Sequence, residues 1–128
     1  MIVLDTHAWI WWASDPDRLS QKALKTIDTA GRLAVAAISC WEFAMLVEKG
    51  RIAVDRNPVD WMEQSFDDLG IELLPLTPVV AVRSTQLGRG FHGDPADRQI
   101  VATSLVHSAS LITRDEKIRD FKPVETIW

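Results

Sequence analysis

This 128-residue sequence has one cysteine, no tyrosine and no long apolar run. The single cysteine, Cys40, cannot form an internal disulfide, which favours a reducing cytoplasm. The longest apolar runs, AWIWWA and LAVAAI, are far shorter than the ~18 residues that a membrane span needs. The N-terminus MIVLDTH lacks the basic and long apolar regions of a signal peptide. We therefore expect a cytoplasmic protein that has no membrane partner.

Net positive charge is also lacking, since 14 Lys and Arg stand against 18 Asp and Glu. This balance argues against a protein that holds nucleic acid by bulk electrostatics. It does not exclude an enzyme that contacts nucleic acid briefly at one metal-neutralised spot. The length and the 47% hydrophobic content predict one soluble globular domain, residues 1–128. Six tryptophans exceed what such a chain usually has, and they suggest both core packing and a protein partner.

Short apolar runs alternate with amphipathic segments along the chain. The pattern predicts helices over residues 7–13, 19–30, 40–50, 57–70, 77–88 and 94–109. It predicts strands over residues 2–4, 32–38, 71–76, 110–115 and 124–128. This alternation indicates an α/β fold with a central, mostly parallel sheet covered by helices on both faces. In such sheets ligands bind at the carboxyl ends of the strands.

Four acidic residues follow or adjoin those strand ends: Asp5, Glu42, Asp97 and Asp115. Each has a structural explanation, because Asp and Ser commonly cap helices. Asp5 and Asp115 could cap the segments after them, and Ser39 with Glu42 matches the S-x-x-E capping box. Asp94, followed by Pro95, is a strong N-cap signal that places Asp97 in the first turn.

Together the four acids indicate more than capping. Carboxylates gathered at one sheet edge repel one another, so some stay protonated unless a cation lies among them. Mg²⁺ or Mn²⁺ suits such a site, because hard ions prefer carboxylate oxygens. Zinc does not, since one cysteine and the scattered His7, His92 and His107 have no zinc-ligand spacing. Carboxylates around Mg²⁺ favour hydrolysis of a phosphodiester by metal-activated water.

Three other interpretations remain beside this one. The segment GRGFHG, residues 88–93, matches a dinucleotide-binding pattern but does not follow a strand. A phosphoacceptor receiver domain would need adjacent acids near the first strand, where only Asp5 stands. A domain that only binds a protein partner, with its acids kept as caps, is the main alternative.

Four ordered blocks resemble the PIN domain family, and within it the VapC-like ribonuclease toxins of bacterial toxin–antitoxin pairs. They are MIVLDTHAWIWW, ISCWEFAMLVEKGRI, GDPADRQIVATS and LITRDEKI, and they span nearly the whole chain. The chain differs from many relatives at Ala96, where a larger apolar residue is usual, and at Ser104, where alanine is common. Neither position is a carboxylate.

The resemblance implies a PIN-like α/β/α sandwich and a Mg²⁺- or Mn²⁺-dependent endoribonuclease. It also implies a homodimer and a cognate antitoxin that covers the active site. Asp5, Glu42, Asp97 and Asp115 carry over as the metal site, with Thr6 and Thr113 as polar groups beside it. Asp94 is expected to be a cap and a secondary contributor. Arg98 and His7 are candidate RNA contacts. For Arg98 a solvated charge at a helix end is an equal alternative, and for His7 a hydrogen-bonded histidine at the sheet edge is the preferred one.

Overall fold

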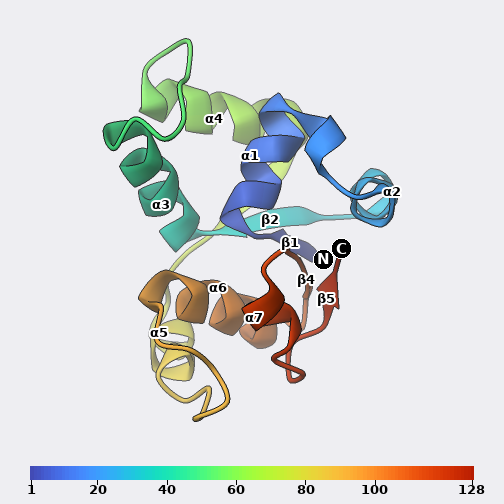
Figure 1. Ribbon diagram of the computed structural model, residues 1–128, viewed down its shortest axis with the longest axis vertical. Coiled ribbons are helices and arrows are strands. Elements are labelled where there is room, and N and C mark those ends of the chain that lie inside the picture. The colour runs from blue at the N-terminus through green and yellow to red at the C-terminus, as the bar shows by residue number, and fades with distance from the viewer.

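A computed structural model describes residues 1–128 and contains one five-stranded parallel sheet. The strand order is β3-β2-β1-β4-β5 (Figure 1). The strands are β1 (Ile2–Leu4), β2 (Leu33–Ala36), β3 (Ile71–Leu74), β4 (Ser110–Ile112) and β5 (Thr126–Ile127). The chain builds one side of the sheet from β1 to β3 and then crosses to place β4 against β1. The direction in which strands are added therefore reverses between β1 and β4. Parallel sheets usually bind ligands at such a reversal, beside the carboxyl ends of the strands.

Helices cover both faces of the sheet (Figure 1). One face carries α1 (Thr6–Ser14), α2 (Gln21–Thr29), α3 (Ala37–Glu48) and α4 (Pro58–Leu69), with the short 3-10 helix η1 (Pro16–Arg18). The other carries α5 (Pro78–Ser84), α6 (Pro95–Val106) and α7 (Glu116–Arg119). Alternate residues of a strand face opposite sides, so Leu4 packs in one core and Val3 in the other. The expected α/β/α sandwich is confirmed, and its sheet is parallel throughout.

Three helices begin with a polar cap followed by proline, as the sequence predicts. Asn57, Thr77 and Asp94 each accept a hydrogen bond from a first-turn backbone N–H. Proline suits the next position because its missing N–H would have no partner inside the helix. The helix expected over residues 77–88 is shorter than predicted and ends at Ser84. No helix of the chain has the length and apolar character needed to cross a bilayer.

The capping box that Ser39 and Glu42 match in the sequence does not form. Strand β2 ends at Ala36 and α3 begins at Ala37, so Ser39 lies inside the helix and Glu42 in its second turn. The N-cap is Ala36, whose side chain makes no capping bond. The apolar run LAVAAI fits a buried strand and a buried helix equally well, which explains the misplaced boundary. The shift turns Ser39 toward the N-terminus of α1 instead of leaving it at a helix end.

Trp9 anchors the larger core cluster. Its side chain is fully buried, its ring stacks on Phe66 at 5.3 Å between centroids, and its Nε1–H donates to Ser65 Oγ at 3.0 Å. Phe43 and Trp61 stack beside it at 4.3 Å. The aromatic packing fixes α1 against α3 and α4, and α1 begins directly after Asp5. The core therefore sets the position of the first acidic residue.

Replacing Ser104 with alanine is expected to stabilise the protein by about 1 kcal/mol. Ser104 is fully buried in α6, and its hydroxyl has no hydrogen-bond partner. Alanine removes that unsatisfied group and has the higher helix propensity. Urea unfolding measures the change. Ser65→Ala is the matched control and should destabilise the protein, because it removes the acceptor of Trp9 Nε1–H. A destabilised Ser104→Ala variant would contradict the expectation.

Candidate active site

Asp5 stands at the carboxyl end of β1, between two hydrogen-bond donors. Its backbone N–H continues the ladder to Ile112 O at 2.9 Å, which fixes the chain beside β4. Its Oδ1 accepts from Thr6 N at 2.8 Å, so Asp5 caps α1 as the sequence allowed. Its Oδ2 accepts from the hydroxyl of Thr113 at 2.6 Å. Asp5 is thus held by the residues that follow two adjacent strands.

Thr113 also joins Asp5 to Asp115. The Thr113 hydroxyl donates to Asp5 and accepts from Asp115 N at 3.1 Å. Asp115 Oδ1 accepts from Ile118 N at 3.0 Å, so this carboxylate caps α7. Thr113 is fully buried, whereas Asp115 is exposed. One hydroxyl therefore fixes the two acids at the junction of β1 and β4.

Glu42 reaches the same edge from the second turn of α3. Its Oε1 lies 2.5 Å from Thr6 Oγ1, and Thr6 Oγ1 lies 2.9 Å from Ser39 Oγ. Since a hydroxyl carries one proton, Thr6 donates to the Glu42 carboxylate and accepts from Ser39. Thr6 and Ser39 are both buried. Sequence reasoning placed Thr6 here but missed Ser39, which it had assigned to the capping box.

Asp97 lies in the first turn of α6, one turn after its cap. Asp94 Oδ1 accepts from Ala96 N at 2.9 Å and from Asp97 N at 3.2 Å. The side chain of Asp97 is therefore free for other contacts, and its Oδ2 lies 2.7 Å from His92 Nε2. An ionised carboxylate only accepts, so the imidazole donates. Sequence reasoning missed His92, because a loop residue five positions before Asp97 follows no regular spacing.

A cleft of about 660 Å³ brings these residues together. We call it the acidic cleft. Its lining carboxylates are Asp5, Glu42, Asp94, Asp97, Asp115 and Glu116. All four acids singled out from the sequence lie in it, along with Asp94. Its other charged or aromatic lining residues are His7, Trp11, Arg18 and Arg114. Trp11, Arg18 and Glu116 are additions that the sequence did not indicate.

Three carboxylates in the acidic cleft, those of Asp5, Glu42 and Asp97, have raised pKa values. Burial raises the pKa of Glu42 to about 7, against the Thr6 hydrogen bond, and nearby carboxylate charges add to the rise. Burial raises the pKa of Asp97 to about 6, against the His92 hydrogen bond, and the charges of neighbouring acids again add. Burial also raises the pKa of Asp5. The cleft therefore holds an excess of negative charge that protons or a cation must offset.

The donor chemistry of the acidic cleft fits a hard divalent cation. Carboxylate oxygens are the ligands that Mg²⁺ and Mn²⁺ prefer, and the raised pKa values indicate that a positive charge would be favourable there. No three Asp, Glu, His or Cys side chains are already arranged to hold one ion. Five of the six acids, all but Glu116, have a hydrogen-bond partner in the protein instead. Side-chain rotation would be needed to bring their oxygens onto a common ion.

Arg98 and His7 differ in their relation to the cleft. Arg98 donates to the backbone oxygens of Ser84 and Phe91 at 3.4 and 3.3 Å, which ties α6 to the end of α5 and to the loop between the two helices. It does not line the acidic cleft, so its proposed RNA contact has no geometric support. His7 is exposed, lines the cleft and packs on Trp11 at 5.7 Å between ring centroids.

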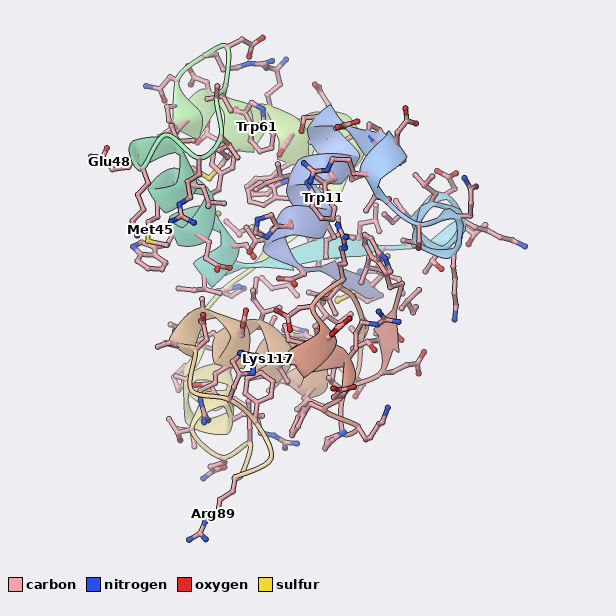
Figure 2. The ribbon with its side chains drawn as sticks, in the orientation of Figure 1. Trp11, Met45, Glu48, Trp61, Arg89 and Lys117 are labelled. Carbon is pink, nitrogen blue, oxygen red and sulfur yellow. The ribbon has the colours of Figure 1, made fainter.

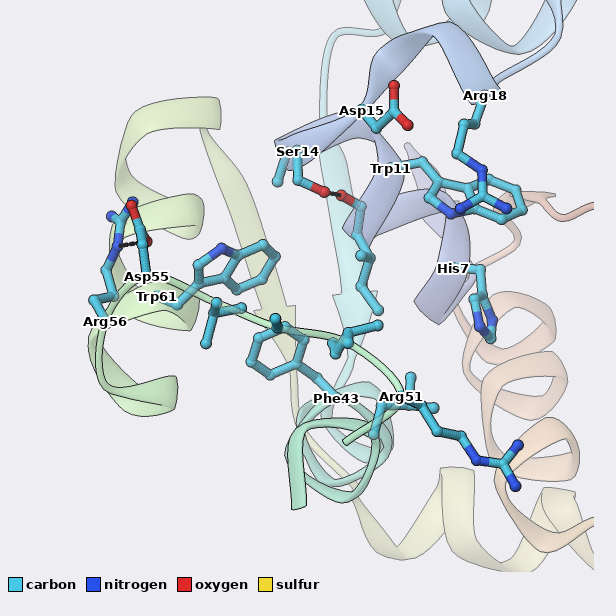
Figure 3. Close-up of a pocket in the computed structure, with 16 residues that line it drawn as sticks. His7, Trp11, Ser14, Asp15, Arg18, Phe43, Arg51, Asp55, Arg56 and Trp61 are labelled. Atoms are coloured by element: carbon cyan, nitrogen blue, oxygen red, sulfur yellow. Dashed lines mark hydrogen bonds and ion pairs between the residues drawn. The ribbon is translucent and has the colours of Figure 1, made fainter. Parts of the chain in front are cut away.

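A second cleft of about 810 Å³ adjoins the first (Figure 3). It lies among α1, α3, α4 and the loop between α3 and α4, and Phe43, Leu46, Val54 and Trp61 line it. His7, Trp11 and Arg18 line both clefts and separate the acids from this more apolar space. A molecule seated in the second cleft would therefore lie next to the carboxylates.

Replacing Asp94 with asparagine is expected to leave stability within about 0.5 kcal/mol, because asparagine caps helices as well as aspartate does. Asp94→Ala should destabilise by about 1 kcal/mol, because Ala96 N and Asp97 N lose their acceptor. Thermal unfolding measures both. Asp94→Asn also removes one carboxylate from the cleft without removing the cap. Weaker divalent-ion binding by Asp94→Asn, in which the helix cap is intact, would assign Asp94 a place in the ion site.

The fold and the site together define a class of protein. It is an α/β/α domain whose carboxylates gather where the strand order of its parallel sheet reverses, between β1 and β4. The model of the family described as PIN domain matches residues 2–122, and the chain belongs to this family. It is 39% identical over 130 residues to Ribonuclease VapC22 of Mycobacterium tuberculosis, covering 99% of this chain and 98% of that protein.

Two solved structures have the same fold. FitAB bound to a DNA fragment is 26% identical with a TM-score of 0.68, covering 98% of this chain and 93% of that one. VapBC-1 of nontypeable Haemophilus influenzae is 14% identical with a TM-score of 0.70, covering 98% and 96%. The family expected from the sequence is confirmed.

Proposed function

We propose that this chain is a cytoplasmic Mg²⁺- or Mn²⁺-dependent endoribonuclease and the toxin of a toxin–antitoxin pair. The carrying observation is the acidic cleft, where carboxylates from β1, α3, α6 and the end of β4 meet. The relative called a ribonuclease supports the reaction, because the similarity covers nearly the full length of both chains. Phosphodiester hydrolysis is the chemistry that a carboxylate-held divalent ion performs with water.

The roles of the acids follow from their positions. Asp5 and Asp97 would hold the cation, and Glu42 and Asp115 would complete its ligands or orient the attacking water. A divalent ion there would supply charge to stabilise the phosphate and would make water a better nucleophile. Thr6 and Thr113 would keep Glu42 and Asp5 in place through the hydrogen bonds already formed. His92 would orient Asp97 in the same way.

Glu42 is suited to take a proton from the attacking water. In the cleft without a divalent ion its pKa is about 7, and a general base works best with a pKa near the working pH. Thr6 holds one carboxylate oxygen, which leaves the other to face the cleft. The Ser39 hydroxyl forms a hydrogen bond with the Thr6 hydroxyl and so holds Thr6 in place. The buried hydroxyls therefore act on the reaction through the position of Glu42.

The competing function is a PIN domain that only binds a partner. Two observations favour it: Asp94 and Asp115 act as caps, and no three acids are arranged around one ion. Calorimetric titration of the protein with Mn²⁺, paired with an RNA cleavage assay, distinguishes the two. Micromolar or tighter binding with cleavage supports the nuclease. Absence of both would leave the binding module.

The proposed partners are an RNA substrate, a cognate antitoxin and a second copy of this chain. The solved structures of VapBC-1 and of a toxin–antitoxin complex from Klebsiella pneumoniae have the same fold as this chain, which supports an antitoxin partner. The second cleft offers an apolar surface beside the acids for such a protein. Exposed apolar side chains lie on and after edge strand β3, at Leu73, Leu76, Val79 and Val82. They suit a homodimer contact. Light scattering tests it, and a monomer mass would contradict it.

A further inference from the structure

Two guanidinium groups lie over one tryptophan at the lip of the acidic cleft. Arg18 Cζ is 4.6 Å from the centre of the Trp11 ring, and Arg114 Cζ is 6.0 Å from it. Arg18 belongs to η1, and Arg114 lies between β4 and α7. Figure 3 shows the Arg18 guanidinium lying across Trp11, with His7 below. Segments distant in sequence thus place two positive charges on one aromatic surface.

Trp11 provides a rigid support for these groups. Its side chain is 8% exposed, and the rings of His7 and Trp128 pack on it with centroids 5.7 and 5.9 Å away. A cation over an aromatic face is attracted by the negative charge of the ring face. The contact restricts two long side chains that would otherwise move freely in water. Trp128, which had no evident role in the sequence, is part of this support.

Neither arginine is neutralised by the protein. The arginine ion pairs of the chain lie elsewhere, at Arg32–Glu72 and Arg56–Asp55. This is unexpected, because six carboxylates line the same cleft as Arg18 and Arg114. Both guanidinium groups lie over the Trp11 ring instead of forming an ion pair with these acids. Two restrained, unpaired guanidiniums are suited to bind an anion that reaches the cleft from outside.

We propose that Arg18 and Arg114, supported by Trp11, bind backbone phosphates of the RNA strand next to the bond that is cut. The proposal rests on the ribonuclease function proposed above. A cleft lined by carboxylates repels a polyanion, and a divalent ion offsets that repulsion at one phosphate only. Arg18 and Arg114 are the only Arg or Lys residues that line the cleft. They supply attraction for the adjoining phosphates, which a protein of net charge −4 otherwise lacks.

Further cations indicate where the strand leaves the cleft. Trp128 packs on Trp11 and also lines a polar pocket of about 420 Å³ between α2 and α7. Lys22, Arg119 and Lys122 line this pocket together with the acids Glu116 and Asp120. The three basic residues outnumber the two acidic ones, so cations are available for further phosphates beyond Trp128. We place the strand on this side of the acidic cleft, opposite α3.

The double variant Arg18→Gln, Arg114→Gln tests the proposal. The KM for single-stranded RNA should rise about 10-fold or more, while kcat in saturating Mn²⁺ stays within about threefold. The slope of log affinity against log salt should fall by about 1.4, because each phosphate contact on a single strand contributes about 0.7. The cleavage positions should not move, since phosphate contacts carry no sequence information.

The matched control is Arg83→Gln, Arg89→Gln, which removes the same charge from exposed positions outside the cleft. Arg83 lies on α5, and Arg89 lies at the tip of the loop farthest from Trp11 in Figure 2. Equal KM values and equal salt slopes in the two double variants would overturn the proposal. Thermal unfolding of both checks that the exposed substitutions leave the fold intact.

A measurement of RNA binding without cleavage tests this proposal independently of the nuclease function. Affinity for a fluorescent single-stranded RNA is measured by anisotropy with Asp97→Asn in the background, where no cleavage is needed. The arginine variant should bind about 10-fold more weakly than the control even if the wild-type protein cleaves no RNA. Equal affinities would overturn the phosphate site whether or not the nuclease function holds.

Discussion

Asp97→Asn is expected to lower the rate of RNA cleavage about 10³-fold and to leave the fold intact. Asparagine keeps the size of the side chain and its hydrogen-bonding contact to His92, but it removes a charge that would hold the divalent ion. The ion then binds more weakly and stabilises the phosphate less. Single-turnover cleavage at saturating RNA and Mn²⁺ measures the rate, and calorimetry measures the affinity for Mn²⁺.

Asp60→Asn is a close control for this variant. Asp60 stands in α4 as Asp97 stands in α6, three positions after the cap and two after a proline. Both substitutions remove the same favourable interaction with the N-terminus of a helix. Asp60 lies outside the acidic cleft, so its variant should cleave RNA at the wild-type rate. Equal activity in the two variants would remove Asp97 from the site.

Glu42→Gln is expected to raise stability and lower activity together. At pH 8, without divalent ions, the variant should be more stable than the wild-type protein by about 1–2 kcal/mol. Cleavage should fall about 10²-fold, because glutamine cannot take a proton from water. Glutamine keeps an oxygen that accepts from the Thr6 hydroxyl, so the buried hydrogen-bond network remains. A gain in stability together with a loss of cleavage would indicate that the Glu42 charge serves function rather than folding.

The stability gain should depend on pH in a defined direction. The pKa of Glu42 is about 7 in the folded protein, above its ordinary value of 4.5, so the folded state binds this proton more tightly than the unfolded state. The resulting stabilisation is complete below pH 4.5 and is lost as the pH rises through 7. Wild-type and variant stabilities should therefore converge near pH 4.5 and separate at pH 8.

Glu48→Gln provides the comparison for Glu42→Gln. Glu48 is the last residue of α3 and is exposed, so its charge has no close acidic neighbour in the cleft. Its substitution should change stability by less than about 0.5 kcal/mol at either pH. Thermal unfolding at pH 5 and pH 8 with a chelator present gives all four comparisons. A gain at pH 8 that Glu48→Gln reproduces would contradict the expectation for Glu42.

Sequence patterns predicted the parallel fold and the gathering of acids because both follow from local rules. Strand ends of a parallel sheet share an edge, and Asp94–Pro95 gives a helix start that directs Asp97 toward it. The contacts of these acids could not be predicted in the same way. His92 meets Asp97 through the course of a loop, and Arg114 meets Trp11 across more than a hundred residues. No periodicity encodes such pairs.

Ser39 shows a different reason for failure. Its spacing to Glu42 matches a capping box, and the preceding run of alanine and valine does not reveal where β2 ends. The helix begins two residues before Ser39, so the same two side chains face Thr6 instead of the backbone. The residue types were recognised correctly, but their partners depended on one helix boundary.

The hydrogen bond from the Thr113 hydroxyl to the Asp5 carboxylate joins residues 108 positions apart in the sequence. During synthesis on the ribosome, Asp5, Glu42 and Asp97 all emerge before the segment that fixes Asp5 and carries Asp115. Because β4 must insert beside β1 from a long sequence separation, its docking has a high contact order and comes late in folding. The acidic cleft therefore cannot be complete in a nascent chain that stops short of β4. A cell making this protein therefore meets the finished cleft only after translation has passed β4 and Asp115.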